Sequence, residues 1–190
     1  MKKTFLFLMA WVMLSISSMS AQNYLGTWKA DSSFKEQLNT LINEENVDLD
    51  LGFVMTKKDI NCQLFMKTAN DNLSVDLVVS IPGTYSVKGD KFTAKFDTEK
   101  SDLKVTNLKS DDPEMNEGLQ MDETKDIWYN LVTTMMKKEL GDSLKTLSDG
   151  VSELFEEFRI KQDVANKLIM LIEDEEEEDG VVEIIFNRAY

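Results

Sequence analysis

Histidine is absent from this chain of 190 residues, and cysteine occurs only once. Without histidine, the chain forms no Ser-His-Asp triad, no Cys-His pair and no His-ligated zinc or copper site. The single cysteine, Cys62, forms no intramolecular disulfide, and we expect it to be a buried and inert thiol. Basic residues number 21 against 35 acidic ones. We therefore expect the protein to bind neither nucleic acid nor anionic membranes, since both need clustered Lys and Arg.

A long hydrophobic run is also missing, but a short one stands near the N-terminus. Two lysines precede the apolar residues 5–16, and small residues follow. This order is typical of a secretory signal peptide, and the run is too short for a membrane-spanning helix. We place the cleavage after Ala21, with Ser20 as the alternative. The sequence thus predicts a signal peptide at 1–21 and a single domain at 22–190, periplasmic or secreted, without membrane insertion after signal removal.

Alternation of apolar and polar residues dominates the middle of the chain. Such alternation is typical of strands with one wet face, which pair antiparallel. Three segments show it, with apolar positions Val47, Leu49, Leu51, Phe53 and Met55, then Cys62, Leu64 and Met66, then Val75, Leu77, Val79 and Ile81. Pro82-Gly83 is predicted to break the third strand. A β-hairpin is predicted from Tyr85 to Phe96, and one more strand from Leu103 to Leu108.

Helical spacing appears in two regions. Ser33 and Glu36 form a capping box for an amphipathic helix from about Phe34 to Asn43. An acidic connector at 110–120 leads to a helical insertion at 122–155. This insertion is either one kinked helix or two consecutive helices. Asp122 is the expected cap, and Gly141 is the expected end of the first helix. The apolar positions at helical spacing are Ile127, Trp128, Leu131, Val132, Met135, Met136, Leu144, Leu147, Val151 and Leu154. Such a stripe needs a covering partner.

Strands are predicted to resume at Phe158. One strand runs to Gln162, a second covers 168–172 after a turn at 163–165, and the last covers 181–188. A helix over 164–178 competes with this assignment, but Gly180 and the alternation after it fit a hairpin better. The acidic loop 173–179 is interpreted as a solvated hairpin loop. A calcium site is the alternative, although the loop lacks the alternating spacing and internal glycine of a calcium loop.

A short signature at the two ends of the domain resembles a known family. Gly26, Thr27 and Trp28 open the first strand, and Arg188 lies in the last. Together they resemble the lipocalin and fatty-acid-binding superfamily. With Pro-Gly-Thr-Tyr at 82–85 and Gly-Asp-Lys-Phe at 89–92, the chain more closely resembles the lipocalin-like extracytoplasmic proteins of Bacteroides-type bacteria. In this interpretation Gly26, Trp28 and Arg188 are structural, and the guanidinium stacks on the indole to close the barrel.

We therefore expect a mainly β fold with about nine short strands. It is an antiparallel up-and-down β-barrel (lipocalin-like) with a short helix after the first strand and a helical insertion before the last three strands. The first helix is either a lid on the barrel mouth, as in the fatty-acid-binding branch, or a plug at the bottom. The insertion covers either the open end of the barrel, which we favour, or an outer flank formed by Val54, Phe65 and Val78.

No enzyme, cofactor or metal site is expected. The resemblance implies a carrier of a small hydrophobic or amphipathic molecule, with inward-facing ligand-binding residues Met66, Leu77, Tyr85, Phe92 and Phe96. The alternative is a protein–protein interaction module of the cell envelope with a filled barrel, whose helices or acidic face bind the partner. An apolar interior cavity of roughly 300 Å³ or more favours the carrier. Trp128, Met135 and Met136 are interpreted as core, with a hydrophobic site as the alternative.

Overall fold

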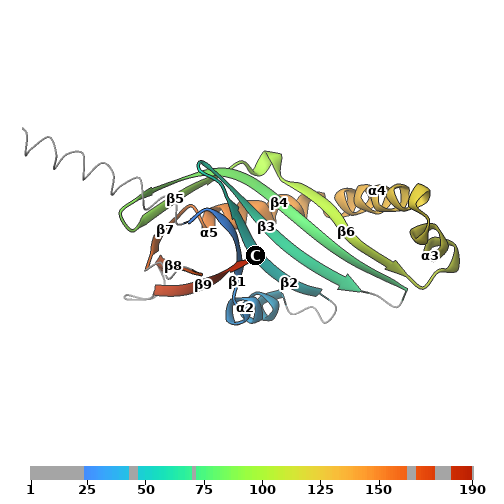
Figure 1. Cartoon of the computed structure of the whole chain (residues 1–190), viewed down its shortest axis with the longest axis horizontal. Helices are drawn as coiled ribbons and strands as arrows, with labels where there is room; N and C mark the ends of the chain where they lie inside the picture. The colour runs from blue at the N-terminus through green and yellow to red at the C-terminus, as the bar shows by residue number, and fades with distance from the viewer. Residues whose placement is uncertain (1–23, 43–46, 70–71, 162–165, 174–180, 190) are drawn as a thin grey trace, which may run out of the picture.

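The computed structural model describes residues 24–42, 47–69, 72–161, 166–173 and 181–189 (Figure 1). The predicted signal peptide, the turn at 163–165 and loop residues 174–179 lie outside the described residues. The strands are β1 (Gly26–Ala30), β2 (Val47–Met55), β3 (Asp59–Ala69), β4 (Leu73–Lys88), β5 (Lys91–Phe96), β6 (Asp102–Ser110), β7 (Glu157–Ile160), β8 (Lys167–Glu173) and β9 (Val181–Ala189). The helices are α2 (Ser32–Ile42), the short η2 (Thr98–Lys100), α3 (Pro113–Gln120), α4 (Asp122–Glu139) and α5 (Gly141–Leu154).

Eight of the described strands close into an antiparallel barrel in the order β1-β2-β3-β4-β5-β7-β8-β9. Strands that follow one another in this order pair with each other, and β9 pairs with β1 to complete the ring. The alternation of apolar and polar residues predicted this arrangement, because each strand has one face toward a shared interior. The predicted fold class, an antiparallel barrel with a helix after the first strand and helices before the last three, is confirmed.

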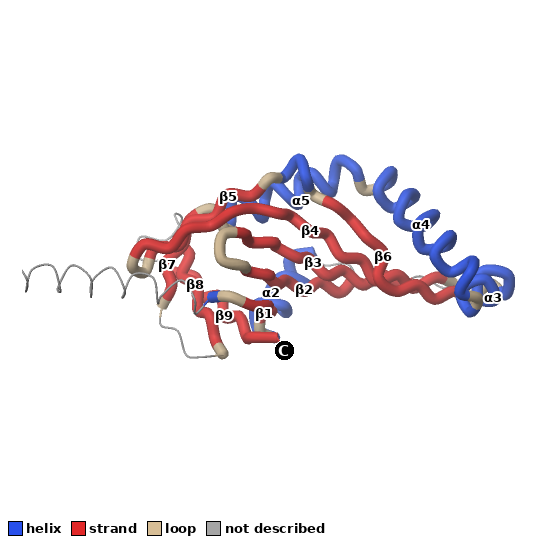
Figure 2. Tube along the Cα trace, turned by 45° about the horizontal axis from the view of Figure 1, so that its top comes forward, coloured by secondary structure: helices blue, strands red, loops and turns tan. Residues whose placement is uncertain are grey.

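The ninth strand, β6, lies outside this ring. It pairs with the first half of β4, on the same edge where β5 pairs with the second half. The sheet therefore continues beyond the barrel, and β6 forms its free edge. Figure 2 shows α4 running beside β6, with α3 at the far end of the strand. The backbone N–H of Val105 donates to Thr133 Oγ1 of α4 at 3.3 Å, so the helix covers the edge.

The predicted break at Pro82-Gly83 is wrong, because β4 continues through both residues as one strand of 16 residues. On one edge β4 pairs with β3, with Pro82 opposite Asn61. On the other edge the partner changes, since pairing with β6 stops at Ser80 and pairing with β5 starts at Gly83. The carbonyl of Pro82 accepts from the N–H of Asp97 at 2.8 Å on that edge. The position where proline lacks an N–H faces this same edge, between the β6 and β5 ladders. No ladder hydrogen bond is therefore lost there.

Two of the predicted helix starts are also wrong. Asp31, not Ser33, caps α2, since its Oδ1 accepts from the N–H of Phe34 at 3.0 Å. The residue before α4 is Met121, and Asp122 is already helical. Both aspartates suit the positive end of a helix dipole, but only the one placed before the first turn reaches its free N–H groups.

The region between β6 and β7 contains three helices. The predicted connector at 110–120 is wrong in part, because α3 forms within it: Asp112 accepts from the N–H of Met115 at 2.9 Å, and Pro113 occupies the first turn. Of the two arrangements open for 122–155, the structure has two consecutive helices. The boundary falls next to Gly141 as expected, since α4 ends at Glu139 and α5 begins at Gly141.

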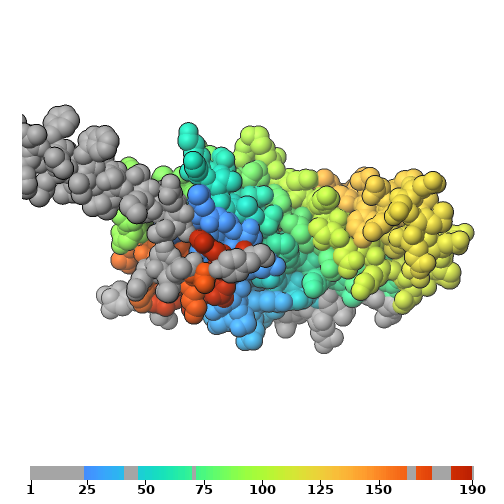
Figure 3. All heavy atoms as spheres, viewed as in Figure 1, coloured from blue at the N-terminus to red at the C-terminus, as the bar shows by residue number. Residues whose placement is uncertain are grey.

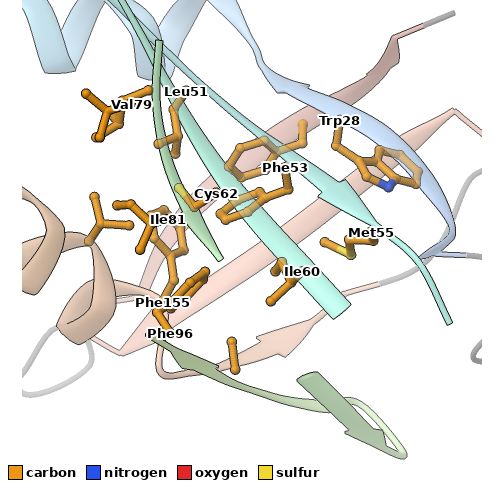
Figure 4. Packing of buried hydrophobic residues seen from close by; sticks show 14 of the residues in the cluster. Trp28, Leu51, Phe53, Met55, Ile60, Cys62, Val79, Ile81, Phe96 and Phe155 are labelled. Carbon is orange, nitrogen blue, oxygen red and sulfur yellow. The ribbon is translucent and has the colours of Figure 1, made fainter. Parts of the chain in front are cut away.

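Aromatic, aliphatic and sulfur-containing side chains pack together in the core, as Figure 4 shows for Phe53, Phe155 and Ile81. Phe155, directly after α5, lies 5.1 Å from the Phe53 ring and 6.4 Å from the Phe186 ring. Phe34 of α2 also contacts Phe186, at 6.5 Å, so α2 and the end of α5 cover the same end of the barrel. The expected covering of an open end therefore holds for α5. Neither expected position of the insertion describes α4, which lies along the edge of β6. On the expected outer flank, the Phe65 ring instead contacts the ammonium group of Lys29, which lies 4.8 Å from the ring centre.

Candidate functional site

The five residues expected to bind a ligand lie on β3, β4 and β5. Met66 lies opposite Leu77 in the ladder between β3 and β4. The Tyr85 ring stacks on the Phe92 ring at 5.1 Å, and Phe96 lies opposite Gly83. Leu77 and Tyr85 are eight positions apart on β4, roughly 26 Å along an extended strand. The five residues therefore fall into two groups along the sheet.

The expected ligand-binding residues are instead packed against protein. Leu77 and Phe92 are almost completely buried, and Phe92 also stacks on Phe158 at 4.5 Å. The Tyr85 hydroxyl donates to the carbonyl oxygen of Thr56 at 2.7 Å. Burial, with a smaller contribution from Asp59, raises the pKa of Tyr85. These contacts describe a hydrophobic core, in which the ring faces are already occupied by other side chains.

The residues expected to close the barrel lie together. Trp28 is opposite Arg188 in the ladder between β1 and β9, and the guanidinium carbon is 4.8 Å from the indole ring centre. The indole N–H donates to the carbonyl of Tyr24 at 2.9 Å, and Arg188 Nη2 donates to Leu25 at 3.4 Å. Gly26 has φ of 129°, which L side chains rarely adopt. This cluster joins the two ends of the domain.

Three cavities described in the structure are lined mainly by strand edges and exposed helix residues. The largest, about 970 Å³, lies where α5 meets β5, β7 and β8. Carboxylates and apolar side chains share its lining, and Lys91 forms an ion pair with Glu157 across it. The other two have volumes of about 520 and 380 Å³ and adjoin η2. Phe96 is the expected ligand-binding residue that lines one of them.

Two fully buried side chains among the described residues carry a thiol or a hydroxyl group. Cys62 is completely buried and free, and burial raises its pKa well above the ordinary thiol range. Ser148 of α5 is also fully buried, and its Oγ has no hydrogen-bond partner. No group of three or more candidate metal ligands occurs within the described ranges. No helix among the described residues is both long and apolar enough to cross a membrane.

Helix α4 carries the most exposed apolar surface described. Ile127, Leu131 and Met135 are 64%, 48% and 52% exposed, far more than the core positions. They are spaced by four residues, so they lie along one face and form an apolar stripe. We call these three residues the apolar stripe. Figure 3 shows the region of α3 and α4, in yellow, at one end of the molecule.

The opposite face of α4 anchors the helix to the sheet. Val132 is buried in the core, and Met136 packs against it. Lys137 forms an ion pair with Asp102 of β6 at 2.5 Å. These contacts fix the rotation of α4, so that the apolar stripe points away from the sheet.

A second contact holds α3 against α4. A methyl group in place of hydrogen at Gly118 would lie 2.3 Å from the indole nitrogen of Trp128, so only glycine lets the two helices approach this closely. The Thr124 hydroxyl also donates to the carbonyl of Gly118 at 2.6 Å. We call α3 and α4 together the helical arm.

Sequence reasoning placed the stripe residues within one covered surface. The six apolar positions of α4 at 127, 128, 131, 132, 135 and 136 span about half of the helix circumference, whereas a helix lying on a sheet buries a narrower face. The structure divides them, since Val132 is buried and Met136 half-buried while Met135 is exposed. The apolar face of α4 is thus wider than the sheet can cover, and this width is the sequence signal that predicts an uncovered face.

No protein-family model matches the chain, and comparisons with curated proteins and with solved structures likewise find no significant match.

Proposed function

We propose that the protein is a non-catalytic binding module that docks another protein through the apolar stripe of α4. The observation that carries this proposal is the exposure of Ile127, Leu131 and Met135 on a helix whose other face is fixed to the sheet. Exposed apolar side chains gathered in one patch and rimmed by polar residues mark interaction sites. The barrel serves as the rigid body that presents the helix.

A protein partner explains this surface better than a small molecule does. Small ligands bind in concave sites that enclose most of their surface, whereas a helix face is convex. Aromatic rings, among them Phe53, Phe92 and Phe155, pack against other rings in the core, and the residues expected to hold a ligand form two groups, one beside Leu77 and one beside Tyr85. The envelope interaction module with a filled barrel is therefore favoured over the carrier.

Family and location belong to the same proposal. The Trp28–Arg188 stack within a closed antiparallel barrel supports a lipocalin-like ancestry. The N-terminal pattern of residues 1–21 supports export, and hence a periplasmic or secreted protein. Mass spectrometry of the protein isolated from its native host checks the export, because a processed chain begins at Gln22 or Ala21 and an unprocessed one retains Met1.

Site-specific photo-crosslinking tests the docking surface. A benzophenone amino acid replaces Leu131 in the native host, and the matched control replaces Val182, a 41% exposed residue of β9. We expect one discrete adduct of defined mass from position 131 and none from position 182.

A paired measurement with a fluorescent fatty-acid probe tests the carrier. We expect no saturable binding to the purified protein. Absence of an adduct from position 131 would overturn the proposed function, and saturable binding of the probe at one site per chain would then favour the carrier.

A further inference from the structure

We infer that the partner docks on the helical arm with a basic amphipathic helix. This inference rests on the proposed function and names the chemistry of the partner. The apolar face of the incoming helix covers Ile127, Leu131 and Met135, and its Lys and Arg side chains face the carboxylates of segment 111–126. Two independent observations support this occupant, namely the shape of the apolar stripe and the charge around it.

The shape of the apolar stripe fits a second helix. Its three residues extend over eight positions, about 12 Å at 1.5 Å per residue, which corresponds to two turns. A facing helix presents side chains at the same spacing, so the two rows interdigitate. Met135 adds an adaptable side chain, and Met121, itself 48% exposed, extends the apolar surface toward α3.

The charge on the α3 side of the apolar stripe is predominantly negative. Segment 111–126 contains seven carboxylates, all on exposed residues, and one basic residue, Lys125. The Lys125 ammonium group lies 5.8 Å from the centre of the Tyr129 ring, on the flank of the arm. One carboxylate oxygen of Asp112 accepts the hydrogen bond that caps α3, and the other carboxylate residues of the segment are exposed to solvent. Glu123 is one turn before Ile127, so an acidic group directly adjoins the stripe.

The charge of the whole chain favours the same partner. At a formal charge of −14, the protein attracts basic partners and repels a second copy of itself and anionic lipid surfaces. The other two basic residues of α4, Lys137 and Lys138, lie in its last turn beyond Met135, and Lys137 is already paired with Asp102. The arm is therefore acidic at its tip and apolar at its middle, which is the complement of a helix with one basic and one apolar face.

A defined peptide tests this inference on the folded protein. The probe is a fluorescein-labelled 18-residue peptide of leucine and lysine arranged with an amphipathic helical period. One control peptide scrambles the same residues, and another replaces every lysine by glutamate. Binding is followed by fluorescence anisotropy at about 50 and about 500 mM NaCl, because salt screens charge attraction but not apolar contact.

We expect saturable binding of the amphipathic lysine peptide, at least tenfold tighter than either control peptide, and a loss of about tenfold in affinity at the higher salt. Leu131→Ser and the double variant Glu117→Gln/Glu123→Gln should each weaken binding about fivefold or more. The matched controls are Val182→Ser for the first and Glu36→Gln/Glu99→Gln for the second. All substituted residues are exposed, and circular dichroism verifies the fold of each variant.

Three results would overturn the inference: no binding of the lysine peptide, equal binding of the scrambled or acidic peptide, or equal losses in the control variants. A self-adduct from position 131, with no peptide binding, would identify a second copy as the occupant. Failure of the peptide alongside an adduct of another mass would refute the basic helix and leave the docking function standing. Absence of any adduct would refute the docking function itself.

Discussion

The stack of Arg188 on Trp28 provides a quantitative test of how the barrel is closed. Trp28 has no exposed surface, so Trp28→Ala should cost about 3–5 kcal/mol of the free energy of unfolding. Arg188→Ala removes the cation over the ring and a hydrogen bond to Leu25, which should cost about 1–2 kcal/mol. Without the indole, the guanidinium has no ring to cover. Arg188→Ala should therefore lower the free energy of unfolding less in the Trp28→Ala variant than in wild type.

A double-mutant cycle measures this coupling. Urea unfolding followed by circular dichroism gives the free energy of each variant, and we expect a coupling of about 0.5–2 kcal/mol. If Trp28→Ala does not fold, Trp28→Leu keeps apolar volume while removing the π face. The matched control is Phe158→Ala, because Phe158 packs on Phe92 and Phe155. Its effect should add to that of Arg188→Ala. Additivity of Trp28 and Arg188 within about 0.5 kcal/mol would refute a closing pair.

Three further outcomes are expected. Cys62 should resist a thiol-specific reagent in the native protein and react fully in guanidinium chloride, since burial raises its pKa and blocks access; rapid native reaction would contradict its burial. The pKa of Tyr85 is raised above the ordinary value of 10.0. Its contribution to stability is therefore complete below pH 10.0 and is lost as the pH rises from there through the raised pKa. Wild type should therefore lose more stability than Tyr85→Phe on going from about pH 9 to about pH 11, and parallel losses would count against this. Ser148→Ala should raise stability by about 1 kcal/mol in thermal unfolding by removing a buried hydroxyl without a partner, and destabilisation would reveal a hidden bond.

Much of the fold followed from local pattern. The strands around Phe53, Leu77 and Ile184 alternate because each has one buried and one wet face, and this rule acts residue by residue. The hairpin from Tyr85 to Phe96 likewise depends on neighbours in the chain, and it is confirmed.

The errors arose where distant strands decide the local structure. The residues near Pro82 do not indicate that the partner of β4 changes there. The proline, which normally ends a strand, therefore predicts a strand end that does not occur. The helix α3 differs from the prediction for another reason. The acidic segment 110–120 predicts a connector, but Asp112 and Pro113 within it form a helix cap and first turn.

The candidate site was the hardest to predict. The sequence pattern predicts that Leu131 is an apolar residue on a helix. It does not predict which apolar faces of that helix are covered by the rest of the protein. The expected ligand residues, among them Leu77 and Phe92, were chosen because they point inward. Whether inward positions meet a ligand or one another depends on the volume that the other strands and Phe155 occupy, which no single segment encodes.

The position of β6 outside the ring has a consequence for how such a protein can change over generations. The register of the barrel is set by the other eight strands, so an insertion or deletion after β6 shifts no residue of the ring out of its place. The helical arm can therefore lengthen, shorten or exchange its surface residues while the closing pair of Trp28 and Arg188 stays intact. A chain built this way separates the residues that set the register of the barrel from those that form the surface of the helical arm.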